Sequence, residues 1–107
     1  MTFITTLETT NGTAKINLSG DLDGSTAEQF KKRIEEVATL DITRLVLLMK
    51  DLDYLASAGL RVLIFAKQKM GANVDIFIVG AQELVLETIK KTGFHHSVIL
   101  LNDYDES

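Results

Sequence analysis

A single serine, Ser57, stands between two alanines in the stretch DLDYLASAGLRVLIF, which runs from Asp51 to Phe65. A hydroxyl in such a place can cap a helix, accept a phosphate or act as a nucleophile. The nucleophile role needs partners, but no Gly-x-Ser-x-Gly elbow surrounds Ser57 and no histidine or aspartate has an evident place in a triad. We therefore expect no catalytic residues and no enzymatic activity.

The other two roles of Ser57 are compatible with each other. Serine is a favoured helix N-cap, because its hydroxyl accepts a hydrogen bond from an amide of the first turn. A phosphate at the same place would meet free amides and the positive end of the helix dipole. A capping hydroxyl at an exposed edge is thus already placed for phosphorylation, and the residues alone leave both interpretations open.

Two adjacent histidines, His95 and His96, are the remaining candidates for chemistry. Neighbouring residues in a strand-like segment point to opposite faces, so the pair would make a poor chelate, and no third ligand accompanies it. We expect both to be loop residues, and we expect neither a metal site nor a cofactor.

The composition limits the classes of protein to consider. A chain of 107 residues with 46% hydrophobic residues can build one core, so we expect a single domain over residues 1–107 with an acidic tail at about 102–107. The net charge of −4 argues against nucleic-acid binding, which depends on clustered lysine and arginine. Because we find neither a membrane-spanning stretch nor a signal peptide, we expect a cytoplasmic protein without membrane insertion, and a monomer.

Hydrophobic periodicity predicts an α/β fold. An alternating stretch from Phe3 to Thr9, the turn residues Asn11 and Gly12, and a second alternating stretch that closes at Gly20 are typical of a β-hairpin. Segments with helical spacing of apolar residues then alternate with unbroken apolar runs typical of buried strands. The predicted order is β-β-α-β-α-β-α-β, with helices from about Ser25, at Ala58–Met70 and at 81–93, and later strands at Leu45–Met49, 73–80 and Ser97–Leu101.

Strand–helix–strand units of this length favour a mostly parallel sheet, joined to the antiparallel hairpin, with the strand at Leu45–Met49 in a central position. The loops after the second, third and fourth strands should then leave one rim of the sheet, where the ligands of open α/β sheets gather. These loops are Asp21–Gly24, Asp51–Ser57 and Gly80–Gln82. Ser25 and Glu28 have the spacing of a capping box, so we expect the first helix to satisfy its own first amides.

The segments LVLLMKDLDYLASAGLRVL, GDLDGSTAEQFKKRI and KKTGFHHSVIL resemble, in order and spacing, a STAS domain of the bacterial anti-sigma factor antagonist type. The resemblance covers nearly the whole chain and implies a single STAS-like domain that acts by partner switching. In that scheme an anti-sigma factor that is also a serine kinase binds the unmodified antagonist and releases its sigma factor. Phosphorylation of the antagonist reverses the exchange, and a phosphatase resets it.

In that family the phosphate acceptor is the serine of a segment that usually reads Asp-Ser-(Ser, Thr or Ala)-Gly-Leu, which implies Ser57 here. The chain departs from the pattern at Ala56, where aspartate is usual, and at Leu48, where a polar residue late in the third strand is common. Asp23 can be interpreted in two ways: the resemblance implies that it belongs to the partner surface, and turn preferences indicate a loop carboxylate that orders the start of the first helix. The implied partner surface consists of Asp23, Thr26, Ala56, Ala58, Gly59, Leu60, Arg61 and Ile64.

The predicted helix Ala58–Met70 is apolar on nearly every side, which indicates burial of most of its side chains. A partly exposed remainder beside Ser57 would be a docking patch, with Arg61 and Lys67 at its edge to meet an acidic partner. The two departures from the family pattern keep a second function open. In it, the domain is a non-phosphorylated scaffold or accessory subunit, for example of a lipid-transport complex.

Overall fold

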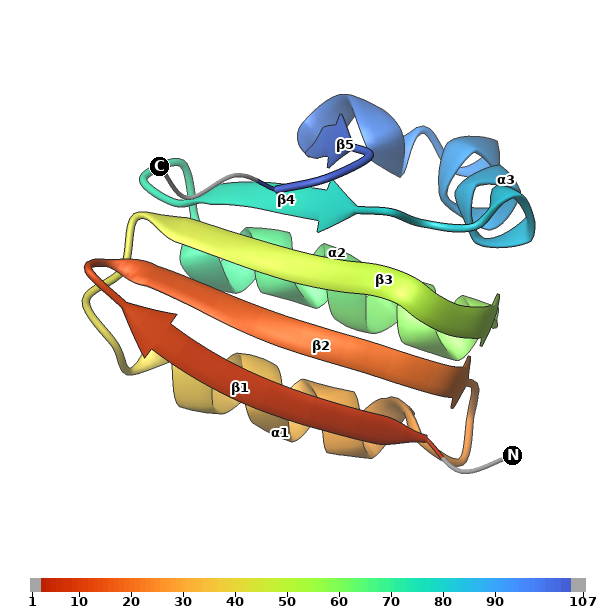
Figure 1. Ribbon diagram of the computed structural model, residues 1–107, viewed down its shortest axis with the longest axis horizontal. Helices are drawn as coiled ribbons and strands as arrows, with labels where there is room; N and C mark the ends of the chain where they lie inside the picture. Colours follow the sequence, from red (N-terminus) through yellow and green to blue (C-terminus); the bar gives the residue numbers. More distant parts are fainter. Residues whose placement is uncertain (1–2, 105–107) are drawn as a thin grey trace.

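Figure 1 shows the computed structural model of the chain, which describes residues 3–104. The strands are β1 (Ile4–Thr10), β2 (Thr13–Leu22), β3 (Arg44–Leu55), β4 (Asp75–Val79) and β5 (Ile99–Leu101). The helices are α1 (Ala27–Ala38), α2 (Ser57–Met70), α3 (Glu83–Lys91) and the short 3-10 helix η1 (Phe94–Ser97). The predicted order of strands and helices is confirmed, and η1 is added to it.

The strands form one mixed sheet in the order β1-β2-β3-β4-β5. β1 runs antiparallel to β2, and the pairs that follow are parallel. The hairpin turn has the positive φ angles of a type I′ turn, 48° at Asn11 and 79° at Gly12, which suit the twist of the strands it joins. The α/β class, the hairpin and the central place of the third strand are therefore confirmed.

One face of the sheet carries the main core. Alternate residues of β2 are buried on this face, and Ile16 lies in register with the equally buried Leu47 of β3. Helices α1 and α2 lie side by side across the same face (Figure 1). α1 buries one stripe, whereas α2 buries Leu60, Val62, Leu63 and Ala66 and leaves its other apolar side chains partly exposed, so its burial is less complete than its composition indicated.

β3 is longer than the predicted strand Leu45–Met49 and continues to Leu55. The prediction stopped where charged residues begin, but Leu52 and Leu55 stay buried while the residues between them are exposed. β2 supports the extension, since its last residue, Leu22, lies in register with Leu55. The start of α2 is therefore held at the end of a pair of long strands.

The opposite face of the sheet is partly covered by the end of the described chain. The ring of Tyr104 packs edge-on against Phe77 with 5.7 Å between ring centroids, and Arg44 Nη1 donates a hydrogen bond of 3.3 Å to its hydroxyl. Val46, in register between Lys15 and Phe77, is fully buried although no helix within residues 3–104 covers this face. The expected acidic tail thus includes a residue that packs on the sheet, and its residues 105–107 lie outside the described residues.

The last helices and the last strand of the described chain are short. Gly93 has a φ of 78° and turns the chain from α3 into η1, which takes in Ser97, so β5 begins only at Ile99. The predicted strand Ser97–Leu101 is shortened for this reason. No helix within residues 3–104 is long and apolar enough to cross a membrane.

Candidate functional site

The ends of β2 and β3 bring two strand-to-helix junctions together. Leu22 and Leu55 end the two strands in register, and the amide of Ala56 donates a hydrogen bond of 2.9 Å to the carbonyl of Leu22. The loop that holds Asp23 therefore lies beside Ser57 at the start of α2. This part of the predicted rim is confirmed.

The third loop of the predicted rim, Gly80–Gln82, lies further back along the sheet. β4 ends in register with the middle of β3. The side-chain amide of Gln82 donates hydrogen bonds to the carbonyl of Lys50 (3.1 Å) and to the carboxylate of Asp53 (3.4 Å), so this loop covers the side of the extended β3. It therefore meets the predicted loop Asp51–Ser57 at Asp53, before Ser57 is reached, because β3 is longer than predicted.

The junction between β2 and α1 is held by side-chain hydrogen bonds. Asp23 Oδ1 accepts bonds from the amide and the hydroxyl of Ser25, at 2.9 and 2.7 Å, and from the amide of Thr26 at 3.2 Å. Thr26 Oγ1 accepts a bond of 2.9 Å from the amide of Asp23 and donates one of 2.9 Å to the carbonyl of Asp21. The interpretation of Asp23 as a carboxylate that orders the first helix is confirmed.

The predicted capping box of Ser25 and Glu28 is wrong. α1 begins at Ala27 with Thr26 as its N-cap, and the Ser25 hydroxyl is bound to Asp23. The hydrogen bond from this hydroxyl, followed by the one from the Ser25 amide, lowers the pKa of Asp23 below its ordinary value of 3.8. The carboxylate is therefore charged at neutral pH, which strengthens every bond it accepts.

The junction between β3 and α2 has no such side-chain bonds. Ala56 is the N-cap, with extended backbone angles, and Ser57 is the first residue of the helix. The Ser57 side chain is exposed and forms no hydrogen bond within residues 3–104. The prediction that Ser57 caps α2 is wrong, because the cap position belongs to the residue before it. The prediction of an exposed hydroxyl at the start of a helix is confirmed.

The start of α2 has unpaired amides and no nearby negative charge on the helix. Its first helical backbone bond runs from the amide of Leu60 to the carbonyl of Ala56, at 3.1 Å, and the amides before it have no acceptor within the helix. The first turn carries no acidic residue, so nothing on the helix offsets the positive end of its dipole beside Ser57. An anion attached to the Ser57 oxygen would meet a favourable field.

Gly59 allows α2 to approach the ends of both strands. A Cβ atom at this position would lie 2.6 Å from Leu22 Cγ and 2.8 Å from Leu55 Cδ1, which is too close for a side chain. The next residue, Leu60, is 5% exposed and belongs to the core. Gly59 and Leu60 therefore lie beneath the predicted partner surface, where they position Ser57.

The remaining residues of the predicted surface lie together. Ser57, Arg61 and Ile64 follow one another at spacings of four and three residues, so they lie along one side of α2, and all three are exposed. We call them the Ser57 stripe. The half-buried residues Asp23, Thr26, Ala56 and Ala58 surround its first end.

Sequence reasoning missed Tyr54. Its side chain is 54% exposed in β3, and it lies in register with Asp21 at the rim. The signal was present, since an aromatic residue next to an inward-facing leucine in a strand points outward. Tyr54 adds an exposed aromatic ring near the end of β3, on the face of the sheet opposite to α1 and α2.

Comparison with known proteins agrees with this geometry. Residues 5–107 match the sequence model of the STAS domain. The chain belongs to the STAS domain family. This membership confirms the predicted STAS-like fold and agrees with the expectation of a non-enzymatic binding protein.

Named relatives of this STAS domain are anti-sigma factor antagonists. The anti-sigma-F factor antagonist RsfB of Mycobacterium tuberculosis is 29% identical over 83 residues, which cover 78% of this chain and 68% of RsfB. A solved anti-sigma factor antagonist from Mycobacterium paratuberculosis has a TM-score of 0.89 at 24% identity, with 98% of this chain and 90% of that one covered. The Bacillus cell fate determinant SpoIIAA, solved in its phosphorylated form, has a TM-score of 0.74 at 19% identity, with 96% and 93% covered.

The histidine pair of this STAS domain lies in η1, not in the strand-like segment that was assumed. The rings of His95 and His96 have centroids 3.9 Å apart, and His95 Nδ1 is shielded from solvent and has no hydrogen-bond partner in the described part of the chain. Burial, and then the charges of His96 and Lys90, lower the pKa of His95 below its ordinary 6.5. Within residues 3–104, no group of histidine, aspartate or glutamate side chains is arranged to hold a metal ion.

Proposed function

We propose that this STAS domain is an anti-sigma factor antagonist that works by partner switching. Unmodified, it binds an anti-sigma factor that is also a serine kinase, and phosphorylation of Ser57 ends that binding until a phosphatase removes the phosphate. The observation that carries the proposal is the exposed, unbonded Ser57 hydroxyl at the open start of α2. The antagonist names of the relatives support the class, and the phosphorylated form of SpoIIAA supports the modification step.

The physical chemistry of the switch follows from the added charge. A phosphoserine carries roughly −1.5 to −2 charges at neutral pH, and the start of α2 accommodates a negative charge. A partner surface shaped for a neutral hydroxyl would instead have to desolvate that charge. If the penalty is about 3 to 4 kcal/mol, affinity falls by more than about a hundredfold. The modification thus weakens binding to the partner and does not destabilise the fold.

The proposed contact surface consists of the Ser57 stripe and the half-buried residues around it. Arg61 and Ile64 would meet acidic and apolar groups of the partner, and Asp23 would hold the neighbouring loop in place for contact. Thr26, Ala56 and Ala58 complete the surface, while Gly59 and Leu60 support it from below. We place the exchange in the cytoplasm and propose that the free domain is a monomer.

Ala56 favours a second candidate function. It stands where the family usually has aspartate, and the first turn of α2 adds no acidic residue, so a kinase would find no carboxylate of the helix beside Ser57. Leu48, which lies in the middle of β3, removes a second polar group of the family pattern. The same surface would then dock permanently on a partner, as in a scaffold or an accessory subunit of a lipid-transport complex.

Intact-mass measurement tests the proposal. The chain is incubated with ATP and each candidate anti-sigma factor kinase of the same genome, and the expected result is a mass increase of one phosphate. Ser57→Ala should abolish this increase, whereas Ser25→Ala, which removes another exposed hydroxyl at the rim, should leave it intact. A stable stoichiometric complex without a mass change would favour the scaffold. Phosphate on the Ser57→Ala variant would contradict the proposed site.

A further inference from the structure

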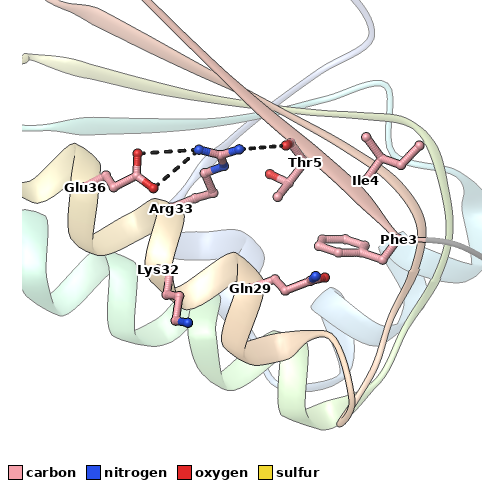
Figure 2. A pocket seen from close by; sticks show the side chains of 7 residues that line it. All are labelled: Phe3, Ile4, Thr5, Gln29, Lys32, Arg33 and Glu36. Carbon is pink, nitrogen blue, oxygen red and sulfur yellow. Dashed lines mark hydrogen bonds and ion pairs between the residues drawn. The ribbon is translucent and has the colours of Figure 1, made fainter.

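β1 forms one edge of the sheet, and a groove runs beside its first residues. The strand order leaves the outer side of β1 without a neighbouring strand among residues 3–104. Between this edge and α1 lies a groove of about 480 Å³ (Figure 2). It is lined by residues 3–5 on one side and by Gln29, Lys32, Arg33 and Glu36 on the other.

One side of α1 forms the wall of this groove. Gln29, Lys32, Arg33 and Glu36 recur at spacings of three and four residues and so share one side of the helix. Figure 2 shows Arg33 reaching toward Thr5 and Gln29 extending toward Phe3. A groove between an edge strand and a helix is a geometry in which an extended peptide can add to a sheet as a further strand.

The outer side of β1 already accepts a hydrogen bond from outside the sheet. Arg33 Nη2 donates a bond of 3.1 Å to the carbonyl of Thr5. Thr5 lies in register with the buried Leu18, so its side chain is on the face that α1 covers, and its Oγ1 is shielded from solvent without a hydrogen-bond partner among the described residues. The Arg33 bond shows that a donor in the groove can reach the main chain of β1 from outside the sheet.

The groove is positively charged in an acidic protein. Lys32 and Arg33 outnumber Glu36 there, although the whole chain has a net charge of −4. The ion pair between Arg33 Nη1 and Glu36 measures 3.3 Å, and the two side chains are 33% and 54% exposed. Such a surface pair is weak, so the carboxylate of a ligand can compete with Glu36 for Arg33.

We propose that this groove binds an extended, acidic segment of a partner protein, which adds as a strand along β1 and places a carboxylate against Lys32 and Arg33. Main-chain bonds to the edge of β1 supply affinity, and the two cations select acidic sequences. No residue of the proposed switching surface lines the groove. The inference therefore holds or fails independently of phosphorylation at Ser57.

The test is an NMR titration of the full chain with a blocked heptapeptide in which valine alternates with glutamate. We expect backbone amide shifts confined to β1 and to the groove side of α1. Lys32→Glu, at an exposed position, should weaken binding by about tenfold or more. Lys69→Glu makes the same charge change at an exposed position of α2 and should leave binding unchanged.

Two further peptides separate strand addition from simple charge attraction. A peptide with lysine in place of glutamate should bind at least about tenfold more weakly, and so should a glutamate peptide whose alternate backbone nitrogens are methylated. Equal binding of these peptides, shifts centred elsewhere, or no binding of the glutamate peptide at millimolar concentration would overturn the proposal. A stable dimer that Lys32→Glu dissociates would also overturn it, by assigning the groove to a second copy.

Discussion

The two strand-to-helix junctions at the rim lie side by side and are built in opposite ways. At the β2–α1 junction, hydrogen bonds converge on the side chains of Asp23 and Thr26. At the β3–α2 junction, the chain is held by the backbone bond of Ala56 and by the close packing of Gly59. Polar side chains hold the first junction, whereas the polar side chain of the second, Ser57, takes no part in holding it.

This difference separates side chains whose hydrogen bonds hold the fold from a side chain that can be modified without loss of a hydrogen bond. Had Ser57 capped α2, a phosphate on its oxygen would have replaced a bond that stabilises the helix. Because Ala56 holds the cap position and Gly59 anchors the first turn on two strands, a change at Ser57 alters charge without removing a bond. The predictions below test the two junctions against each other.

Gly59→Ala should have the largest effect on stability. The new Cβ would lie 2.6 Å from Leu22 Cγ and 2.8 Å from Leu55 Cδ1, and both leucines are buried with little room to move. Overpacking costs about 1–3 kcal/mol, and the better helix propensity of alanine returns about 1 kcal/mol. With two leucines displaced we expect a net loss of about 2 kcal/mol, seen by calorimetry as a Tm lower by about 10 °C.

Gly24→Ala is the matched control at the other junction. No heavy atom lies within 4 Å of the position that its Cβ would take. Alanine there restricts the unfolded chain, so stability should stay equal or rise by about 0.4–1 kcal/mol. If Gly24→Ala and Gly59→Ala lost equal amounts of unfolding free energy, close packing would not distinguish the two junctions.

Thr26→Val should have the next largest effect. Valine keeps the shape of threonine but removes Oγ1, which leaves the amide of Asp23 and the carbonyl of Asp21 without their partner. We expect a loss of about 1 kcal/mol in the free energy of unfolding, measured by urea denaturation. Thr26→Ser keeps the oxygen and should recover most of the loss. A serine variant as unstable as the valine variant would show that the methyl group, and not the hydroxyl, holds this junction.

A smaller effect should appear in the pH dependence of stability. The folded-state pKa of Asp23 is below its ordinary 3.8, because Ser25 and Thr26 donate to the charged form. A lowered pKa stabilises the fold above the unfolded-state value, and this stabilisation is lost as the pH falls through the folded-state pKa. The Tm difference between the natural chain and Asp23→Asn should therefore narrow as the pH falls below 3.8. A carbon-13 titration of the Asp23 carboxyl with its midpoint at or above 3.8 would contradict this account.

The sequence predicts the order of strands and helices because the signals are local. Alternation in β2 and helical spacing in α1 each arise from side chains within one element. The role of Asp23 in ordering the first helix was predicted, but its hydrogen-bond partners were not, since Ser25 and Glu28 match a capping box and the choice depends on how the end of β2 directs the chain. Contacts between distant segments, such as Tyr104 on Phe77 or the groove beside β1, leave no periodic signal.

The position of Ser57 relative to the start of α2 was predicted to within one residue. Ser57 was expected to be both exposed and a cap, and only the exposure is found. Sequence preferences for helix starts are shared by neighbouring positions, so they do not distinguish the cap from the first helical residue. That distinction matters here, because it decides whether phosphorylation would disturb the helix.

Ser57→Asp should change stability least. An acidic residue in the first turn of α2 meets the positive end of the dipole and removes no existing bond, so we expect a gain of about 0.3–1 kcal/mol or no change. Ser57→Ala, the neutral control, should match the natural chain both in Tm and in binding to the proposed kinase partner, measured by calorimetric titration. If the aspartate variant unfolds at a clearly lower temperature, α2 depends on the hydroxyl, and the contrast between the junctions fails. If it is stable but binds the partner as tightly as the alanine variant does, negative charge at this oxygen does not control binding, and Ser57 is not a switch.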